Sequence, residues 1–84
     1  MRVISQEGDI DVNYDNVTLS VCMDDYSGCY EILAVSLLSN NTYWELAEYT
    51  KKETVGKVLN DFRRKCDSGG TWYQFPRNKD VESL

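Results

Sequence analysis

The sequence contains no histidine, one proline and three cysteines among its 84 residues. Without histidine the chain has no Ser-His-Asp triad, no Cys-His pair and no imidazole ligand for a metal. The cysteines are odd in number, and none of them has the C-x-x-C spacing of zinc sites and redox motifs. We therefore expect three reduced thiols that pack as small apolar residues. These absences favour a protein that is not an enzyme and holds neither a metal nor a cofactor.

Long hydrophobic segments are missing as well. The longest largely apolar run, residues 32–38, is too short to span a bilayer. Residues 1–8 lack the apolar core of a signal peptide. We therefore expect a cytoplasmic protein with no membrane partner. A chain of this length buries a single core, so one domain is expected at residues 1–76, with a polar and frayed tail at residues 77–84.

The net charge of −5 is unevenly distributed along the chain. Residues 1–49 hold nine acidic side chains and one basic side chain, whereas residues 50–84 hold eight basic and five acidic ones. Such an asymmetry indicates either two differently solvated surfaces or a charged partner. Because affinity for nucleic acid comes from cations, the acidic half disfavours direct binding of DNA or RNA. A basic surface on another protein is the partner that this half favours.

Five to six short strands are predicted. Residues 17–23 alternate apolar and polar side chains, which is typical of a half-buried strand. Residues 30–38 are apolar at nearly every position, as in a central strand that is covered on both faces. The other strands are predicted at residues 3–5, 10–14, 42–49 and 71–76. Turns separate most of them, so we expect an antiparallel β-meander.

One amphipathic helix is predicted at about residues 51–66. The sequence from Thr50 to Glu53 has the pattern of a capping box, in which each side chain bonds to the other residue's backbone N–H. An apolar stripe follows at helical spacing: Val55, Val58, Leu59, Phe62 and Cys66. The expected fold is therefore α+β, with the helix packed on one face of the sheet. The other face would be covered by the N-terminal hairpin or by a second copy of the chain, which makes a homodimer.

Three blocks of the sequence resemble a known family. They are residues 1–15, with MRVISQEG followed by DVNYD, residues 46–59, at the junction of a strand and the helix, and residues 73–76, which read YQFP. These blocks are similar to small uncharacterised proteins encoded by phages and prophages of Gram-positive bacteria. Asn13 stands where the family pattern has proline. The resemblance implies a mobile element and the cytoplasm of a bacterial host, and it implies no particular activity.

Two candidate sites follow from these patterns. Aromatic residues concentrate in the predicted strands, where they suit a pleated surface and also protein interfaces. An acidic, aromatic sheet surface is predicted at Asp24, Asp25, Tyr30, Glu31, Tyr43 and Trp44. It would bind a host protein, for example a nucleic-acid-binding antiviral defence protein that an anti-CRISPR-like inhibitor blocks. The alternative is an oligomeric sponge that sequesters a small nucleotide immune signal at Arg63, Arg64, Trp72 and Tyr73. A structural or regulatory phage accessory protein is a third hypothesis.

Overall fold

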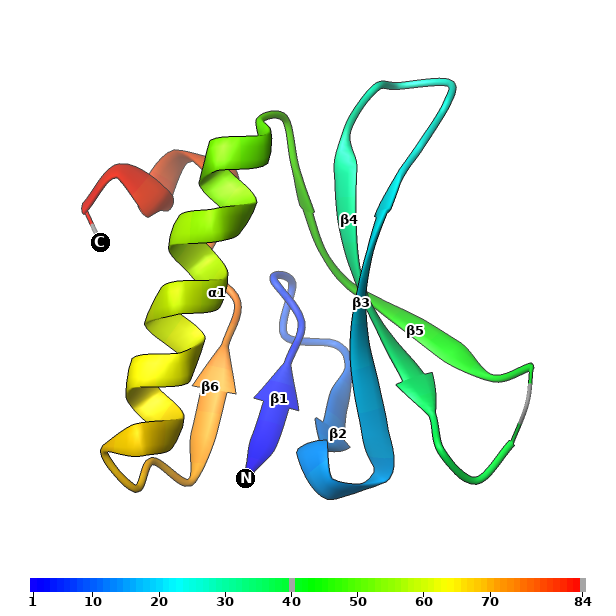
Figure 1. Ribbon diagram of the computed structural model, residues 1–84, viewed down its shortest axis with the longest axis vertical. Coiled ribbons are helices and arrows are strands. Elements are labelled where there is room, and N and C mark those ends of the chain that lie inside the picture. The colour runs from blue at the N-terminus through cyan, green and yellow to red at the C-terminus, as the bar shows by residue number, and fades with distance from the viewer. Residues whose placement is uncertain (40, 84) are drawn as a thin grey trace.

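The computed structural model describes residues 1–39 and 41–83, and within them it contains six strands, one α-helix and two 3-10 helices. The elements are β1 (Arg2–Ile4), β2 (Asp11–Asn13), η1 (Tyr14–Asn16), β3 (Val17–Met23), β4 (Tyr30–Ser36), β5 (Tyr43–Tyr49), α1 (Lys52–Asp67), β6 (Trp72–Gln74) and η2 (Asn78–Ser83) (Figure 1). The predicted α+β class, with six strands and a single helix, is confirmed. No helix in the described ranges is both long and apolar enough to cross a membrane.

The strands divide between two sheets instead of forming one continuous meander. One sheet has the order β2-β1-β6 and the other has the order β3-β4-β5. All pairs in the second sheet are antiparallel, whereas β1 and β6 run parallel. Parallel neighbours need a long crossover connection, and here most of the chain lies between them. The pairing of β6 with β1 therefore joins the two ends of the domain.

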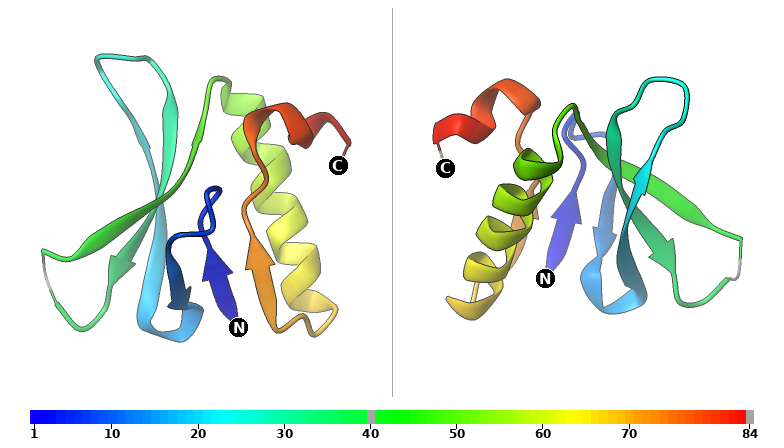
Figure 2. Two further views of the ribbon diagram at one scale, coloured as in Figure 1. Left: turned by 180° about the vertical axis from the view of Figure 1, so that it is seen from behind. Right: turned by 45° about the horizontal axis from the view of Figure 1, so that its top comes forward.

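The core lies where α1 and the two sheets meet (Figures 1 and 2). The predicted helical stripe is confirmed, because Val55, Val58 and Phe62 are buried. The ring of Phe62 lies 5.1 Å from the Tyr14 ring and 5.3 Å from the Tyr73 ring, between ring centroids. Both contacts are edge-to-face, which is the favoured geometry for aromatic pairs. Phe62 therefore connects the helix to β6 of the β2-β1-β6 sheet and to η1, which precedes β3.

The capping box predicted at the start of α1 is not formed. The N-cap residue is Lys51, and no side chain there accepts a hydrogen bond from the first turn. The Thr50 hydroxyl instead accepts a hydrogen bond of 3.2 Å from the side chain of Asn78. Asn78 begins η2, which lies beside the first turn of α1 (Figure 1). Thr50 thus connects the C-terminal segment to the helix, and the helix begins one residue later than the capping pattern predicts.

The C-terminal segment packs on the domain. Val81 of η2 is only 2% exposed and belongs to the core. The Tyr49 hydroxyl donates a 2.7 Å hydrogen bond to the carbonyl of Pro76, which lies just before η2. Burial raises the pKa of Tyr49, so the phenol stays a neutral donor. The expectation of a frayed tail therefore fails for residues 78–81.

Strand β4 is central, as predicted, but only one of its faces is covered. Ile32 and Ala34 are buried against the core. Leu33 and Val35 point to the opposite face and are half-buried. The strand ends at Ser36, and Leu37 is 63% exposed just beyond it. One face of the β3-β4-β5 sheet is consequently open.

Candidate functional site

The open face of the β3-β4-β5 sheet is the most distinctive surface of the molecule. Side chains alternate between the two faces of each strand, so the strand register assigns every residue to one face. The outer face, as we call it, contains Thr18, Ser20, Cys22, Glu31, Leu33, Val35, Tyr43, Glu45 and Glu48. Their arrangement is a grid of three rows that cross the three strands. Uncharged side chains fill β3, apolar ones fill the centre of β4, and glutamates lie along one end of β4 and along β5.

A β-bulge brings two of the glutamates to the same face. Glu45 pairs with Leu33 and Ala47 pairs with Ile32, so Leu46 is an extra residue in β5. Such an insertion shifts the alternation of side chains by one position. Glu48 consequently points to the same side as Glu45, although strict alternation would separate them. The buried Leu46 side chain packs into the core at this point.

Three carboxylates therefore gather on the outer face. Glu31 and Glu48 are direct partners across β4 and β5, and Glu45 is a neighbour on β5. Within residues 1–39 and 41–83, none of the three forms a salt bridge with a lysine or arginine. The pKa of Glu45 is raised above its ordinary value, first by partial burial and then by the negative charges of Glu31 and Glu48. The outer face is therefore a local concentration of negative potential.

A cavity of about 360 Å³ extends this acidic surface past the edge of β5. It lies between β5 and the loop after β1, and Glu45 and Glu48 form part of its wall. Glu7 and Asp9 contribute two further carboxylates. Glu7 lies 3.6 Å from Arg77, and Asp9 accepts a 2.8 Å hydrogen bond from the buried Ser5 hydroxyl. These two carboxylates are thus partly compensated within the fold, unlike those of the outer face.

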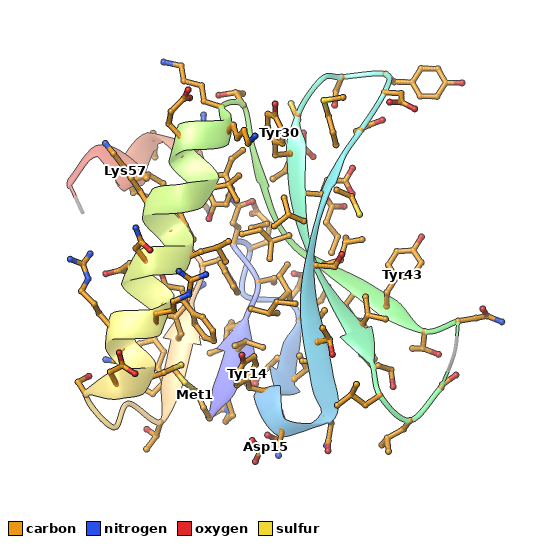
Figure 3. All side chains as sticks on the ribbon, viewed as in Figure 1. Met1, Tyr14, Asp15, Tyr30, Tyr43 and Lys57 are labelled. Carbon is orange, nitrogen blue, oxygen red and sulfur yellow. The ribbon has the colours of Figure 1, made fainter. Side chains whose placement is uncertain are left out.

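The structure places only part of the predicted acidic site on the outer face. Glu31 and Tyr43 belong to it, and Tyr43 is 62% exposed and points away from α1 (Figure 3). Tyr30 and Trp44 point to the inner face and pack against the core. Tyr30 lies on the side of the sheet that faces the start of α1 (Figure 3). The predicted aromatic surface is thus divided between the two faces of the sheet.

The two predicted aspartates lie in the turn between β3 and β4. Asp24 shapes this turn, because its carboxylate accepts 3.0 Å hydrogen bonds from the Tyr26 backbone N–H and the Ser27 hydroxyl. Asp25 is exposed beside it. Gly28 completes the turn with a φ of +71°, a conformation that glycine adopts without steric cost. Asp24 adds to the negative charge near Glu45 without being a member of the outer face.

Sequence reasoning missed Glu45, Glu48, Leu33 and Val35. The two glutamates are three residues apart, which in a regular strand places them on opposite faces. Leu33 and Val35 belong to the strand that was expected to be covered on both sides. In the sequence, an open sheet face is indicated by alternating polar and apolar residues. Strand β4 lacks this alternation because it is apolar at nearly every position, so its sequence does not indicate that one face is open.

The second predicted site is partly assembled beside β6. Arg64, Trp72 and Tyr73 line one cavity of about 500 Å³, together with Lys65 and Asp61. The Lys65 ammonium lies 5.6 Å from the centroid of the Trp72 ring. The Tyr73 hydroxyl donates a 2.8 Å hydrogen bond to Asp61, and burial together with this bond raises the pKa of Tyr73.

Arg63 is not part of that cavity. Its guanidinium donates a 3.3 Å hydrogen bond to the Asn60 side chain, whereas the Arg64 guanidinium lies 3.7 Å from Asp61. The two neighbouring arginines therefore have different partners on the helix surface.

The described residues contain no group of three or more histidine, cysteine, aspartate or glutamate side chains arranged to hold a metal ion. The three cysteines are free thiols, and Cys66 lies on the helical stripe with its sulfur 3.4 Å from the Met1 sulfur. This contact is typical of sulfur packing in a partly buried position.

Comparison with known proteins gives no match: no family model, no curated protein and no solved structure resembles the chain significantly.

Proposed function

We propose that this protein is a non-catalytic binding protein that uses the outer face to bind a basic surface of another protein. One observation carries the proposal: Glu31, Glu45 and Glu48 crowd together on an open sheet face, and none of them forms a salt bridge with a basic side chain among the described residues. Like charges that face each other across strands destabilise a sheet. A partner that brings cations to this face would relieve the repulsion and gain favourable charge pairing.

The apolar part of the same face supports binding to a protein. Across β4 and β5, Leu33 pairs with Glu45 and Val35 pairs with Tyr43, so the apolar side chains adjoin both a carboxylate and an aromatic ring. Protein interfaces combine such an apolar and aromatic centre with a charged rim, and tyrosine is enriched among the residues that contribute most to affinity. A free cation or a small polyamine would gain little from contact with these apolar side chains.

Proteins that bind nucleic acid are the partner class that fits best. Their binding grooves carry clustered lysine and arginine side chains, which an acidic protein surface can occupy. Together with the resemblance to phage and prophage proteins, this points to a host antiviral defence protein in the bacterial cytoplasm as the target. The protein would act as a competitive inhibitor of nucleic-acid binding, in the manner of an anti-CRISPR protein.

Charge-neutralising variants test this proposal. The triple variant Glu31→Gln, Glu45→Gln and Glu48→Gln removes three charges from the outer face and keeps the side-chain shapes. A matched control removes three exposed charges from η1 and α1: Asp15→Asn, Glu53→Gln and Asp67→Asn. If each outer-face charge contributes roughly 0.5–1 kcal/mol, the triple variant should bind about tenfold more weakly or worse.

The assay uses partners captured from a host lysate, whose affinity for each variant is then measured in solution. We expect the outer-face variant to lose the partner, the control variant to keep it, and added DNA or RNA to compete with the protein. Equal affinity of the outer-face variant and the unaltered protein would refute the proposal.

The cavity beside β6 supports a second candidate function, the sequestration of a small nucleotide. Arg64 and Lys65 supply cations for a phosphate, and Trp72 supplies an aromatic face that is 50% exposed. Native mass spectrometry of the purified protein and quenching of tryptophan fluorescence by a panel of nucleotides test this function. Binding should be lost in Arg64→Gln and kept in Arg63→Gln. A protein that is purified empty and does not respond to any nucleotide would remove this candidate.

A further inference from the structure

The two edges of the β3-β4-β5 sheet differ in whether other residues hydrogen-bond to their backbone groups. Along β5, the backbone N–H of Gln6 donates a 2.8 Å hydrogen bond to the Leu46 carbonyl. The Gln6 side chain then bonds both backbone groups of Glu48: its oxygen accepts from the N–H at 2.9 Å and its nitrogen donates to the carbonyl at 3.2 Å. The Gln6 amide thus imitates a neighbouring strand, and the bulge further interrupts this edge. A second chain cannot pair with β5 at these positions.

The edge of β3 has no comparable protection. Within the described part of the chain, β4 is the only strand that pairs with β3, and the pairing runs without a bulge over all seven residues. The strand contains no charge, no proline and no glycine. Natural sheets protect their edges with such residues, with bulges or with short strands, because an open edge pairs with other chains. Val21 and Met23 are 45% and 57% exposed on this strand.

The other free edges in the molecule are short. Strands β2 and β6, at the edges of the smaller sheet, have three residues each. A three-residue strand offers few backbone bonds to a second chain, and β2 also contains the charged Asp11, which forms an ion pair with Arg2 of β1. The edge of β3 is therefore the one long, regular and uncharged edge in the described residues.

We propose that two copies of the protein pair through their β3 strands, antiparallel and about a two-fold axis at Ser20, to form one six-stranded sheet. Full overlap of the seven-residue strand places the axis at its central residue. The pairing then sets Val17 against Met23 and Leu19 against Val21, so apolar side chains meet apolar ones. On the outer face, Thr18 meets Cys22 and Ser20 meets its own counterpart. A two-fold interface must be self-complementary in this way.

The charges of the two copies do not oppose this arrangement. The outer-face side chains of β3 are all uncharged, and the nearest glutamates are on β4. Neighbouring strands are about 4.8 Å apart, so the two copies of β4 would be separated by roughly 14 Å. This separation exceeds the Debye length of about 8 Å at physiological ionic strength. Strand β3 carries no charge that would favour a particular strand of another protein. The β3 strand of a second copy, in contrast, matches it along all seven residues.

Cross-linking tests the pairing and its register. Facing residues of an antiparallel pair have Cα atoms about 4.5–5.5 Å apart, which is within the range of a disulfide. In a Cys22→Ser background, we expect Ser20→Cys to give a covalent dimer under mild oxidation. The matched variant Thr18→Cys, on the same face and in the same background, should give none, because its counterpart lies opposite residue 22. Cross-linking of Thr18→Cys in place of Ser20→Cys would overturn the proposal.

Sedimentation equilibrium tests the dimer without any cross-link. The unaltered protein should have twice the mass of one chain, and Val21→Lys should reduce this to the mass of one chain, because it places a charge on the pairing edge. Leu38→Lys is the matched control: Leu38 is 82% exposed beyond β4, so this variant should remain dimeric. Circular dichroism checks that both variants are folded. A protein that is monomeric at all concentrations, that dimerises equally well as Val21→Lys, or that adds only a strand from another protein would refute the proposal.

Discussion

The crowded carboxylates of the outer face make a prediction about stability that does not require the partner. We expect Glu45→Gln to stabilise the protein. Glu45 is repelled by Glu31 and Glu48, and the face is open to water, so a dielectric constant near that of water applies. Two unit charges about 6 Å apart then repel by roughly 0.7 kcal/mol, and cross-strand charge pairs are worth about 0.2–1 kcal/mol. Removing two such repulsions should raise the free energy of unfolding by about 1 kcal/mol.

The expected change in melting temperature follows from the size of the domain. For 60–100 residues, 1 kcal/mol corresponds to a shift of about 4–8 °C. Thermal unfolding followed by circular dichroism measures a shift of this size directly. Salt should reduce the gain, because the Debye length falls to about 3 Å at 1 M ionic strength. The part of the gain that persisted at high salt would come from relief of the partial burial of the Glu45 charge, or from packing or hydrogen bonding, instead of from repulsion between the carboxylates.

The pH dependence has a definite sign. The pKa of Glu45 is raised in the folded state, so the folded protein holds the proton more tightly than the unfolded chain does. Ionisation of Glu45 therefore costs stability, and this cost is complete above the folded-state pKa. The gain from Glu45→Gln should be largest near neutral pH and should vanish as the pH falls below the ordinary glutamate pKa of 4.5.

A second glutamate provides the control for the same chemical change. Glu53 lies in the first turn of α1, where a negative charge interacts favourably with the helix dipole. Glu53→Gln should therefore lower the stability slightly or leave it unchanged. If Glu45→Gln were neutral or destabilising at pH 7 and low salt, the carboxylates of the outer face would not repel one another, and the electrostatic basis of the proposed function would fail.

Three further predictions concern the core and the C-terminal segment, and urea denaturation measures each of them. Tyr49→Phe removes the hydrogen bond to Pro76 and should lower the free energy of unfolding by about 1 kcal/mol, whereas no loss would mean that the 3.1 Å hydrogen bond from the Gln6 side chain satisfies the Pro76 carbonyl alone. Phe62→Ala should cost about 3–5 kcal/mol, a large share of a total of roughly 5–15 kcal/mol, and a small loss would contradict its place at the centre of the aromatic cluster. Val81→Ala removes two buried carbon atoms and should cost about 1.5 kcal/mol, and a neutral result would show that η2 frays in solution.

Sequence patterns predict the local elements of this protein well, because their signals are local. The spacing of Val55, Val58 and Phe62 determines which side of α1 is buried, and the same three residues are buried in the structure. The alternation over residues 17–23 matches β3 residue for residue. The division into two sheets, in contrast, depends on contacts between segments that are distant in the sequence. Pairing of β6 with β1 brings together segments that are about seventy residues apart, and no local pattern specifies it.

The start of the helix shows how tertiary contacts override a local signal. Thr50 and Glu53 have the right spacing for a capping box. Asn78 is far away in the sequence, yet its side chain donates a hydrogen bond to the Thr50 hydroxyl and accepts one from the Thr50 backbone N–H. The local pattern and the distant partner compete for the same groups, and only the folded chain shows which of them is bonded.

The candidate site depends on the β-bulge in β5, which is a single extra residue. Without the bulge at Leu46, Glu45 and Glu48 would point to opposite faces, and neither face would carry three glutamates. The sequence does indicate an acidic sheet half, and it correctly places Glu31 and Tyr43 in strands. The choice between the two faces requires the register, because a shift of one residue exchanges them.

Pairing through the β3 edge would strengthen binding by the acidic face. A two-fold axis perpendicular to the sheet leaves the outer faces of both copies on the same side. The dimer would therefore present two clusters of glutamates on one continuous surface, separated by the uncharged β3 strands. A partner with a long basic groove could contact both clusters, and the second contact would raise the affinity without any new chemistry.

The two effects can be separated with the variants already described. Val21→Lys should bind a basic partner more weakly because it offers one cluster, and each remaining contact should still depend on Glu31, Glu45 and Glu48. The triple glutamine variant should dimerise normally and fail to bind. If Val21→Lys bound as tightly as the unaltered protein, a single acidic cluster would account for all of the affinity. The dimer would then serve only to cover the exposed Val21 and Met23 side chains.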